Sequence, residues 1–259
     1  MKTAFKLSWI IAILAVLDSA GGLFIRDLYR DPENIKVGWL GNDLITLAIV
    51  APGLFITLKR VGHGSMRNQL VWMGLLGYIL YNYAFYLFGA AFNVFFLLYV
   101  AIFSSSIFAL SLGLGGLNVE EISKRFSRNT PTKWIAIFLL FISVPLCIIE
   151  VGYCINFILT GKTPGPPSLI FALDLSIVVP TTALAAFLLI KRQPWGYILA
   201  MIMLIKAFTY GLGLSLSSII IANFSSAGTW DPFIPFYVFI ALGGFIGSVF
   251  FLRCFKERA

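Results

Sequence analysis

WIAIFLLFISVPLCIIEVGYCINFIL, residues 134–159, is a run of 26 residues in which Glu150 is the only charged side chain. A helix needs about 20 apolar residues to cross the hydrocarbon core of a bilayer. This run is therefore long enough to span a membrane, and it carries one acid inside the span. The segment decides the fold class, which we predict to be an all-α membrane protein.

The composition of the whole chain agrees with this segment. Hydrophobic residues make up 59% of the 259 residues and charged residues only 12%, whereas soluble domains carry about 25% charged residues. The net charge is +8, but the basic residues lie in short loops and do not form one patch. We therefore expect the lipid bilayer as a partner and no nucleic acid. The length fits a single integral membrane domain, residues 1–259.

Seven further apolar runs have the length of a membrane span. The eight predicted spans cover residues 6–25, 38–58, 69–89, 93–114, 134–159, 168–190, 195–221 and 233–253. An even number of spans places both termini on one side of the membrane. The predicted architecture is a polytopic transmembrane helical bundle.

Basic residues are divided unevenly between the two sides that these spans define. The side with the termini carries 14 of them: Lys2, Lys6, Lys59, Arg60, Arg67, Lys124, Arg125, Arg128, Lys133, Lys191, Arg192, Arg253, Lys256 and Arg258. The other side carries 4, which are Arg26, Arg30, Lys36 and Lys162. Because cytoplasmic loops are enriched in Lys and Arg, we predict a multi-pass protein of the cell (plasma or inner) membrane with both termini in the cytoplasm.

Charged side chains inside the spans are the strongest indication of a functional site. A charge at the centre of a span costs roughly 2.5–3.5 kcal/mol on insertion scales. At a rise of about 1.5 Å per residue, the four buried acids fall in the outer half of the membrane, Asn82 lies near the level of Asp18, and Lys206 lies near the midplane. We therefore predict an outward-facing polar cluster. Its candidate ligand-binding residues are Asp18, Asp43, Asn82, Glu150, Asp174 and Lys206.

Structural roles for these residues remain open at this point. A buried carboxyl can be protonated and hydrogen-bonded to a backbone carbonyl. Asp174 and Lys206 lie on adjacent spans and can form an ion pair, or Lys206 can bind a substrate carboxylate, or the two can act in proton coupling. In the third span, aromatic side chains share a helix face with Asn82, and they pack in the core, form hydrogen bonds between helices or line a ligand site. The stripe comprises Tyr78, Tyr81, Asn82, Phe85 and Tyr86.

The second four spans resemble the first four. Asp18 near the end of span one matches Glu150 in span five, and Asp43 in span two matches Asp174 in span six; the acids are 25 residues apart in one half and 24 in the other. Spans two and six also end similarly, in LFITLKR and AFLLIKR. We predict a parallel duplication of a four-helix unit about an axis along the membrane normal. Its parts are residues 1–116, a cytoplasmic connector at 117–132, and residues 133–259.

Three stretches carry a resemblance to known sequences. They are LVWMGLLGYILYNYAFYLFGAAFNVFFLLYVAIF (70–103), ALDLSIVVP (172–180) and RQPWGYILAMIMLIKA (192–207). They are similar to segments of a family of eight-helix integral membrane proteins of bacteria and archaea that has no assigned activity. The resemblance extends over most of the chain and implies the membrane class but no reaction.

Three functions are compatible with these patterns. Because acids outnumber the buried lysine four to one, the favoured one is binding or transport of a small cationic or amine-like ligand. The second is an intramembrane enzyme acting on a lipid or isoprenoid, with Asp18 and Asp43 as acid and base. The third is a structural or accessory subunit, although buried polar contacts in membranes contribute only about 0.6 kcal/mol on average.

Metal and cofactor chemistry is not expected. His63 is the only histidine and lies in a loop. The cysteines Cys147, Cys154 and Cys254 lack the spacing of a metal site. The chain also lacks a phosphate-binding glycine loop or dinucleotide motif. The sequence therefore favours a non-enzymatic membrane protein without a bound cofactor.

Overall fold

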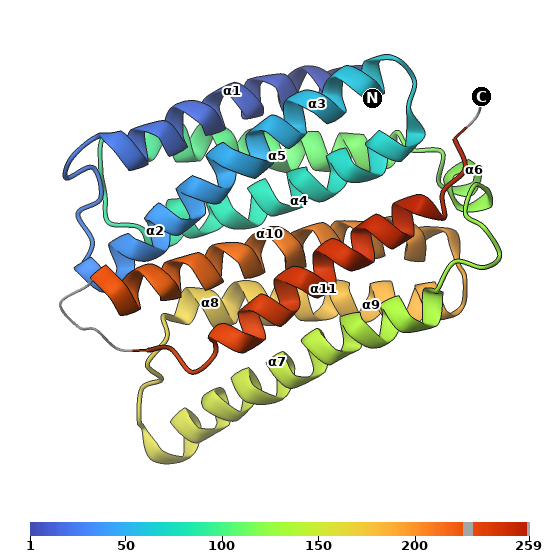
Figure 1. Ribbon diagram of the computed structural model, residues 1–259. Helices are drawn as coiled ribbons and strands as arrows, with labels where there is room; N and C mark the ends of the chain where they lie inside the picture. Colours follow the sequence, from blue (N-terminus) through green and yellow to red (C-terminus); the bar gives the residue numbers. More distant parts are fainter. Residues whose placement is uncertain (225–229, 258–259) are drawn as a thin grey trace.

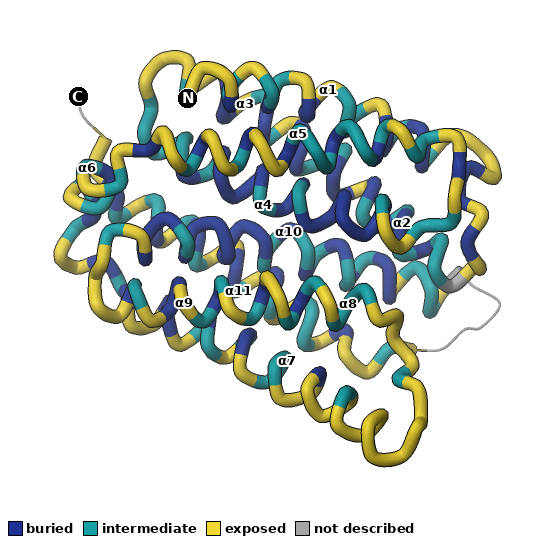
Figure 2. Tube along the Cα trace, turned by 180° about the vertical axis from the view of Figure 1, so that it is seen from behind, coloured by how far each residue is buried: buried dark blue, intermediate teal, exposed yellow. Residues whose placement is uncertain are grey.

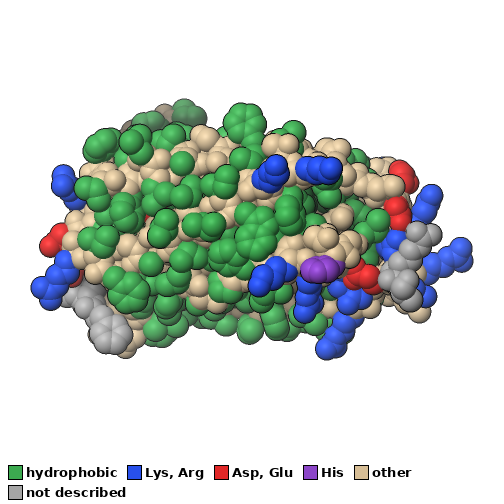
Figure 3. All heavy atoms as spheres, turned by 90° about the horizontal axis from the view of Figure 1, so that it is seen from above, with side chains coloured by type: hydrophobic (Ala, Val, Ile, Leu, Met, Phe, Trp, Pro, Cys, Tyr) green, Lys and Arg blue, Asp and Glu red, His purple; other side chains and the backbone are tan. Residues whose placement is uncertain are grey.

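The chain folds as an all-α polytopic bundle, which confirms the predicted fold class. The computed structural model describes residues 1–224 and 230–257 (Figure 1). Within them, eight helices are long and apolar enough to cross a membrane: Lys2–Phe24, Ile35–Gly62, Met66–Gly89, Phe96–Gly115, Thr132–Thr160, Ser168–Ile190, Pro194–Asn223 and Ile234–Arg253. Apolar side chains cover the flank of the molecule, and Lys and Arg gather toward its ends (Figure 3).

Two of the spans are interrupted by a π-helix. The elements in chain order are α1 (Lys2–Phe24), α2 (Glu33–Ile45), η1 (Thr46–Val50), α3 (Ala51–Gly62), α4 (Met66–Gly89), α5 (Phe96–Gly115), α6 (Val119–Lys124), α7 (Thr132–Thr160), α8 (Ser168–Leu173), η2 (Asp174–Val178), α9 (Val179–Ile190), α10 (Pro194–Phe224) and α11 (Ile234–Arg253). The π-helices η1 and η2 form the middle of the second and sixth spans.

The span positions agree with the sequence prediction to within a few residues. The largest differences are at helix ends that leave the apolar core: α2 begins at Glu33 and not at residue 38, α1 begins at Lys2 and not at residue 6, and α3 ends at Gly62 and not at residue 58. Helical hydrogen bonding continues past the apolar limit, for example from the Phe5 amide to the Met1 carbonyl at 2.9 Å. The short helix α6 lies in the connector and was not predicted.

The helices α4 and α10 form the centre of the molecule. In their most apolar 18-residue windows, 78% and 67% of residues are buried, against 28–44% in the other six spans. The two helices pack against each other, and Figure 2 shows their dark, buried traces between the more exposed outer helices. In the first half α3 and α5 pack against α4, and in the second half α7, α9 and α11 pack against α10. The halves meet mainly where α10 packs against α4 and α2.

Each π-helix is followed by a proline. Pro52 and Pro180 are the second residues of α3 and α9. Proline removes a backbone donor and crowds the preceding turn, and a π-helix widens the turn by one residue. Such segments often occur at functional sites. Here, η2 begins at Asp174, one of the candidate site residues.

The chain after α11 contacts the connector and the first half, forming a segment that we call the C-terminal clamp. Phe126 of the connector and Phe255 form an isolated antiparallel bridge. The Arg67 guanidinium at the start of α4 donates to the Phe255 carbonyl at 2.7 Å and forms an ion pair with Glu257 at 3.7 Å. The Phe126 ring also packs on Phe251 of α11, with centroids 4.5 Å apart. The clamp therefore joins the two halves at the end of the bundle that holds both termini.

Candidate functional site

Five of the six candidate residues are distributed over two clusters, one in each half. In the first, Asp43 of α2 is fully buried and accepts hydrogen bonds from two tyrosines. The Tyr29 hydroxyl donates at 2.5 Å and the Tyr86 hydroxyl at 2.9 Å. A Cβ atom at Gly22 would lie 1.9 Å from Asp43 Oδ2, so glycine is required for this close approach of α1. Both carboxylate oxygens are thus satisfied by the protein itself.

Tyr29 lies in the loop before α2, outside the spans. Burial, and then the neighbouring Asp43 carboxylate, raise the pKa of the Tyr29 hydroxyl far above its ordinary value. The pKa rises because the low polarity of the surroundings and the nearby negative charge both disfavour the ionised form of the hydroxyl. Tyr29 therefore keeps its proton at every physiological pH and stays a hydrogen-bond donor to Asp43.

Asp18 of α1 completes the first cluster. It is fully buried and accepts a hydrogen bond of 2.7 Å from the Tyr83 hydroxyl of α4. It lies close enough to Asp43 for the two acids to interact electrostatically. Neither acid lines the cavity described below. The first cluster is therefore a packed hydrogen-bond network.

The second cluster contains Asp174, Lys206 and Glu150. Asp174 at the start of η2 accepts a hydrogen bond from the Tyr81 hydroxyl of α4. The ion pairs among the described residues are Arg67–Glu257 and Arg125–Glu121, so the expected Asp174–Lys206 ion pair is not formed. The Lys206 ammonium instead lies 3.6 Å from the Tyr81 ring centroid and 4.8 Å from that of Tyr210. Tyrosine rings attract cations through their quadrupole, which explains this position.

Glu150 of α7 gives the second cluster a second carboxylate. It is 4% exposed, and it interacts electrostatically with both Asp174 and Lys206. Its Oε2 atom is buried without a hydrogen-bond partner in the described structure. Two carboxylates therefore lie beside one ammonium. An uncompensated buried charge is strongly destabilising. One more proton or cation is therefore needed to balance the second carboxylate.

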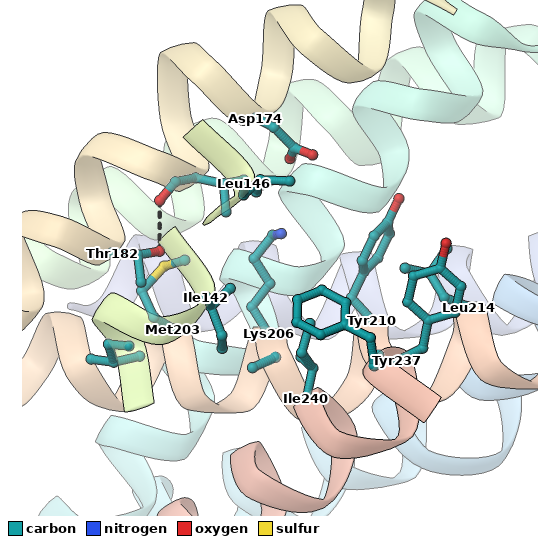
Figure 4. Close-up of a pocket in the computed structure, with 15 residues that line it drawn as sticks. Ile142, Leu146, Asp174, Thr182, Met203, Lys206, Tyr210, Leu214, Tyr237 and Ile240 are labelled. Atoms are coloured by element: carbon teal, nitrogen blue, oxygen red, sulfur yellow. Dashed lines mark hydrogen bonds between the residues drawn. The ribbon is translucent and has the colours of Figure 1, made fainter. Parts of the chain in front are cut away.

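A cavity of about 120 Å³ lies beside this cluster, between α7, α9, α10 and α11. Its polar lining residues are Asp174, Thr182, Lys206, Tyr210 and Tyr237, and the other lining residues are apolar. Figure 4 shows the Lys206 side chain extending toward Asp174, with the rings of Tyr210 and Tyr237 beside it. The second cluster therefore faces an open space, unlike the first.

Asn82 joins neither cluster through a hydrogen bond. It is fully buried in α4, and both its amide nitrogen and its oxygen lack a partner in the described structure. It lies one turn from Tyr78, whose hydroxyl is 3.1 Å from Thr46 Oγ1, and one turn from Tyr86. Its face of α4 therefore points toward the second span, and its ligand-binding role stays a prediction.

Sequence reasoning identified two of the tyrosines that bind the acids, Tyr81 and Tyr86, but it missed Tyr83 and Tyr29 and all of the pairings. The predicted aromatic stripe of α4 is divided: Tyr81 contacts Asp174 in the second half, whereas Tyr86 contacts Asp43 in the first. Tyr83, which was not part of the stripe, binds Asp18, and Tyr29 from a loop binds Asp43. The feature of the sequence that could have indicated these hydrogen bonds is the number of tyrosines close together in the third span. Their pairing depended on the packing of α4 between the halves.

Comparison with known proteins gives no relative. No family model matches the chain, and neither a curated protein nor a solved structure matches it. The protein is therefore identified by its own structure as a polytopic membrane protein. The resemblance to eight-helix bacterial and archaeal proteins stays a prediction.

Proposed function

We propose that this protein binds, and transports across the cell membrane, a small ligand that carries a protonated amine. The observation that carries the proposal is the second cluster, in which Asp174 and Lys206 line a cavity. Glu150 does not line the cavity, but it interacts electrostatically with both of them and adds a second carboxyl group. A cationic ligand would supply the missing positive charge. Charges buried in a medium of low polarity interact strongly, so this balance would favour an amine over a neutral molecule of the same shape.

The aromatic lining supports the same ligand class. The Tyr81 and Tyr210 rings already hold one cation, the Lys206 ammonium. Aromatic rings beside carboxylates are a common way of holding ammonium groups. The cavity, about 120 Å³ in volume, would accommodate an amine head group and a few further atoms. Without a ligand, a proton on one carboxylate would balance the cluster, so binding would exchange a proton for an amine.

The first cluster supports a structural role for Asp18 and Asp43. Both oxygens of Asp43 and Oδ2 of Asp18 accept hydrogen bonds from tyrosines, Asp18 Oδ1 has no partner in the described structure, and neither acid lines the cavity. We therefore assign ligand binding to Asp174, Glu150 and Lys206 and helix attachment to the first two acids. The predicted ligand site is thereby reduced from six residues in one cluster to these three. Asp18 can serve as a matched control for Asp174, because it is a buried acid outside the proposed site.

Thermal stabilisation by a short amine tests the proposal. A ligand that binds only the folded state raises the melting temperature by mass action. We expect butylamine at pH 7, where it is protonated, to raise the melting temperature of the purified protein, and butanol to have no such effect. Asp174→Asn should remove the shift, and Asp18→Asn should retain it. An equal shift by butanol, or an unchanged shift in Asp174→Asn, would contradict the proposal.

A further inference from the structure

A second hollow lies on the other side of Lys206. This groove, of about 460 Å³, lies between α4 and α5 of the first half and α9 and α10 of the second. Its lining is almost wholly apolar and includes Phe103, Ile107 and Ile177. Ile107 is 40% exposed and Ile177 48% exposed, so the groove opens on the flank that faces lipid. Lipid, and not water, is the medium outside this opening.

Side chains alone separate the groove from the polar cavity. Lys206, Met203 and Val178 line both hollows. Lys206 is 9% exposed and its ammonium is held over the Tyr81 ring, which also lines the groove. A lysine stem is flexible and its ammonium can rotate to new partners. Movement of this side chain would therefore connect the lipid-facing groove to the carboxylates.

We propose that the ligand is a single-chain amphiphilic amine, with its hydrocarbon chain in the groove and its ammonium beside Asp174 and Glu150. This inference rests on the proposed function of the cavity. The occupant follows from two features. The carboxyl groups of Asp174 and Glu150 outnumber the one ammonium of the cluster, and the groove next to the cavity, from which it is separated by Lys206, Met203 and Val178, is apolar and open to lipid. An amine with such a chain reaches the site laterally from the bilayer. Lys206 moves aside but remains in the cluster, where two carboxylates then face two cations.

Two probes and three variants test this assignment in protein reconstituted in lipid nanodiscs. The probes are butylamine and dodecylamine, measured by calorimetry against empty nanodiscs. Ile107→Trp fills the groove from α5. Leu112→Trp is its matched control, because Leu112 is 45% exposed on the same helix and does not line the groove. Asp174→Asn reports on the amine site itself.

The expected pattern separates chain binding from head-group binding. Ile107→Trp should lower dodecylamine affinity at least tenfold and leave butylamine affinity unchanged. Leu112→Trp should change neither, and Asp174→Asn should remove both. Thr181→Phe fills the same groove from α9 and should reproduce the Ile107→Trp result, which guards against a local folding defect in α5.

Three other outcomes would overturn the inference in distinguishable ways. If both groove-filling variants leave dodecylamine binding unchanged while butylamine still depends on Asp174, the chain does not use the groove and the proposed function stands. If dodecylamine responds to the groove variants but not to Asp174→Asn, the groove holds a chain without an amine in the cavity. If neither probe depends on Asp174, the proposed function fails together with the inference.

Discussion

At the scale of residues, the tyrosines of α4 determine where each acid is held. Tyr81, Tyr83 and Tyr86 donate to Asp174, Asp18 and Asp43. Successive helix residues are about 100° apart, so Tyr81 and Tyr83 point in nearly opposite directions. One helix can bind acids of both halves only when it lies between them. The central position of α4 is therefore what allows it to donate hydrogen bonds to three acids within the spans.

The Tyr83–Asp18 contact should contribute to stability and not to ligand binding. We expect a double-mutant cycle of Tyr83→Phe and Asp18→Asn to give a coupling energy of about 0.6 kcal/mol, the average for polar contacts in membranes. The free energy of unfolding in mixed micelles measures it. Butylamine stabilisation should be the same in all four proteins of the cycle, and its loss in either single variant would place the first cluster in the ligand site.

The sequence was sufficient to find the acids but not their partners. A charged residue in an apolar span is evident without a structure, and Asp18, Asp43, Glu150 and Asp174 were identified in this way. Hydrogen-bond partners depend on how each helix is rotated about its axis. That rotation cannot be obtained here from a pattern of 3.6 residues per turn, because nearly every position in these spans is apolar. The contact of Lys206 with rings, and not with Asp174, is one such case.

At the scale of elements, the paired π-helices support the proposed duplication. Pro52 and Pro180 lie nine and six residues after their acids, which weakens a match based on the acids. Each proline lies six residues after the first residue of its π-helix, Thr46 or Asp174. We propose that the π-helix and proline are the matching features of the two units. The acid then occupies a different position in each, which fits the different surroundings of Asp43 and Asp174.

Removing one residue from η2 should abolish amine binding. Deletion of Ile177 would convert the π turn to an α turn and rotate Asp174 by about 100° relative to α9, away from the cavity. Deletion of Ile49 from η1 is the matched change in the first half and should leave butylamine stabilisation intact. Folding is checked by size-exclusion elution of both variants. Retained binding in a folded Ile177 deletion would show that η2 does not orient the site.

Span positions were predictable because length and hydropathy determine them, whereas the π-helices were not. A π turn adds one residue without a change in composition, so spans two and six resembled ordinary helices. Their prolines gave a partial signal, since a proline within a span disturbs the preceding turn. The connector helix α6 was missed for another reason. Asn118 caps it by accepting a hydrogen bond from the Glu121 amide, but the charges of this segment were interpreted only as a signal of membrane topology.

At the scale of the whole molecule, the charge difference between the two ends predicts the orientation. The structure places the N-terminus and the end of α11 at one end of the bundle, as an even number of spans requires. The sequence assigns 14 basic residues to that side and 4 to the other, with Arg258 outside the described residues, and this excess predicts that the end faces the cytoplasm. Epitope tags at either terminus should be protected from protease in intact cells and cleaved after permeabilisation. Cleavage of either tag in intact cells would reverse or refute this topology.

The C-terminal clamp has a mechanical consequence for the proposed transport. It ties the last residues of the second half to Arg67 of the first, so the halves cannot separate at the end that holds the termini while these contacts persist. Relative motion of the two halves is then a rotation about that end, with the greatest displacement at the opposite end. Loss of the whole clamp, and not of the exposed Arg67–Glu257 pair alone, would free the pivot and let both ends of the bundle separate, so that the proposed carrier would leak.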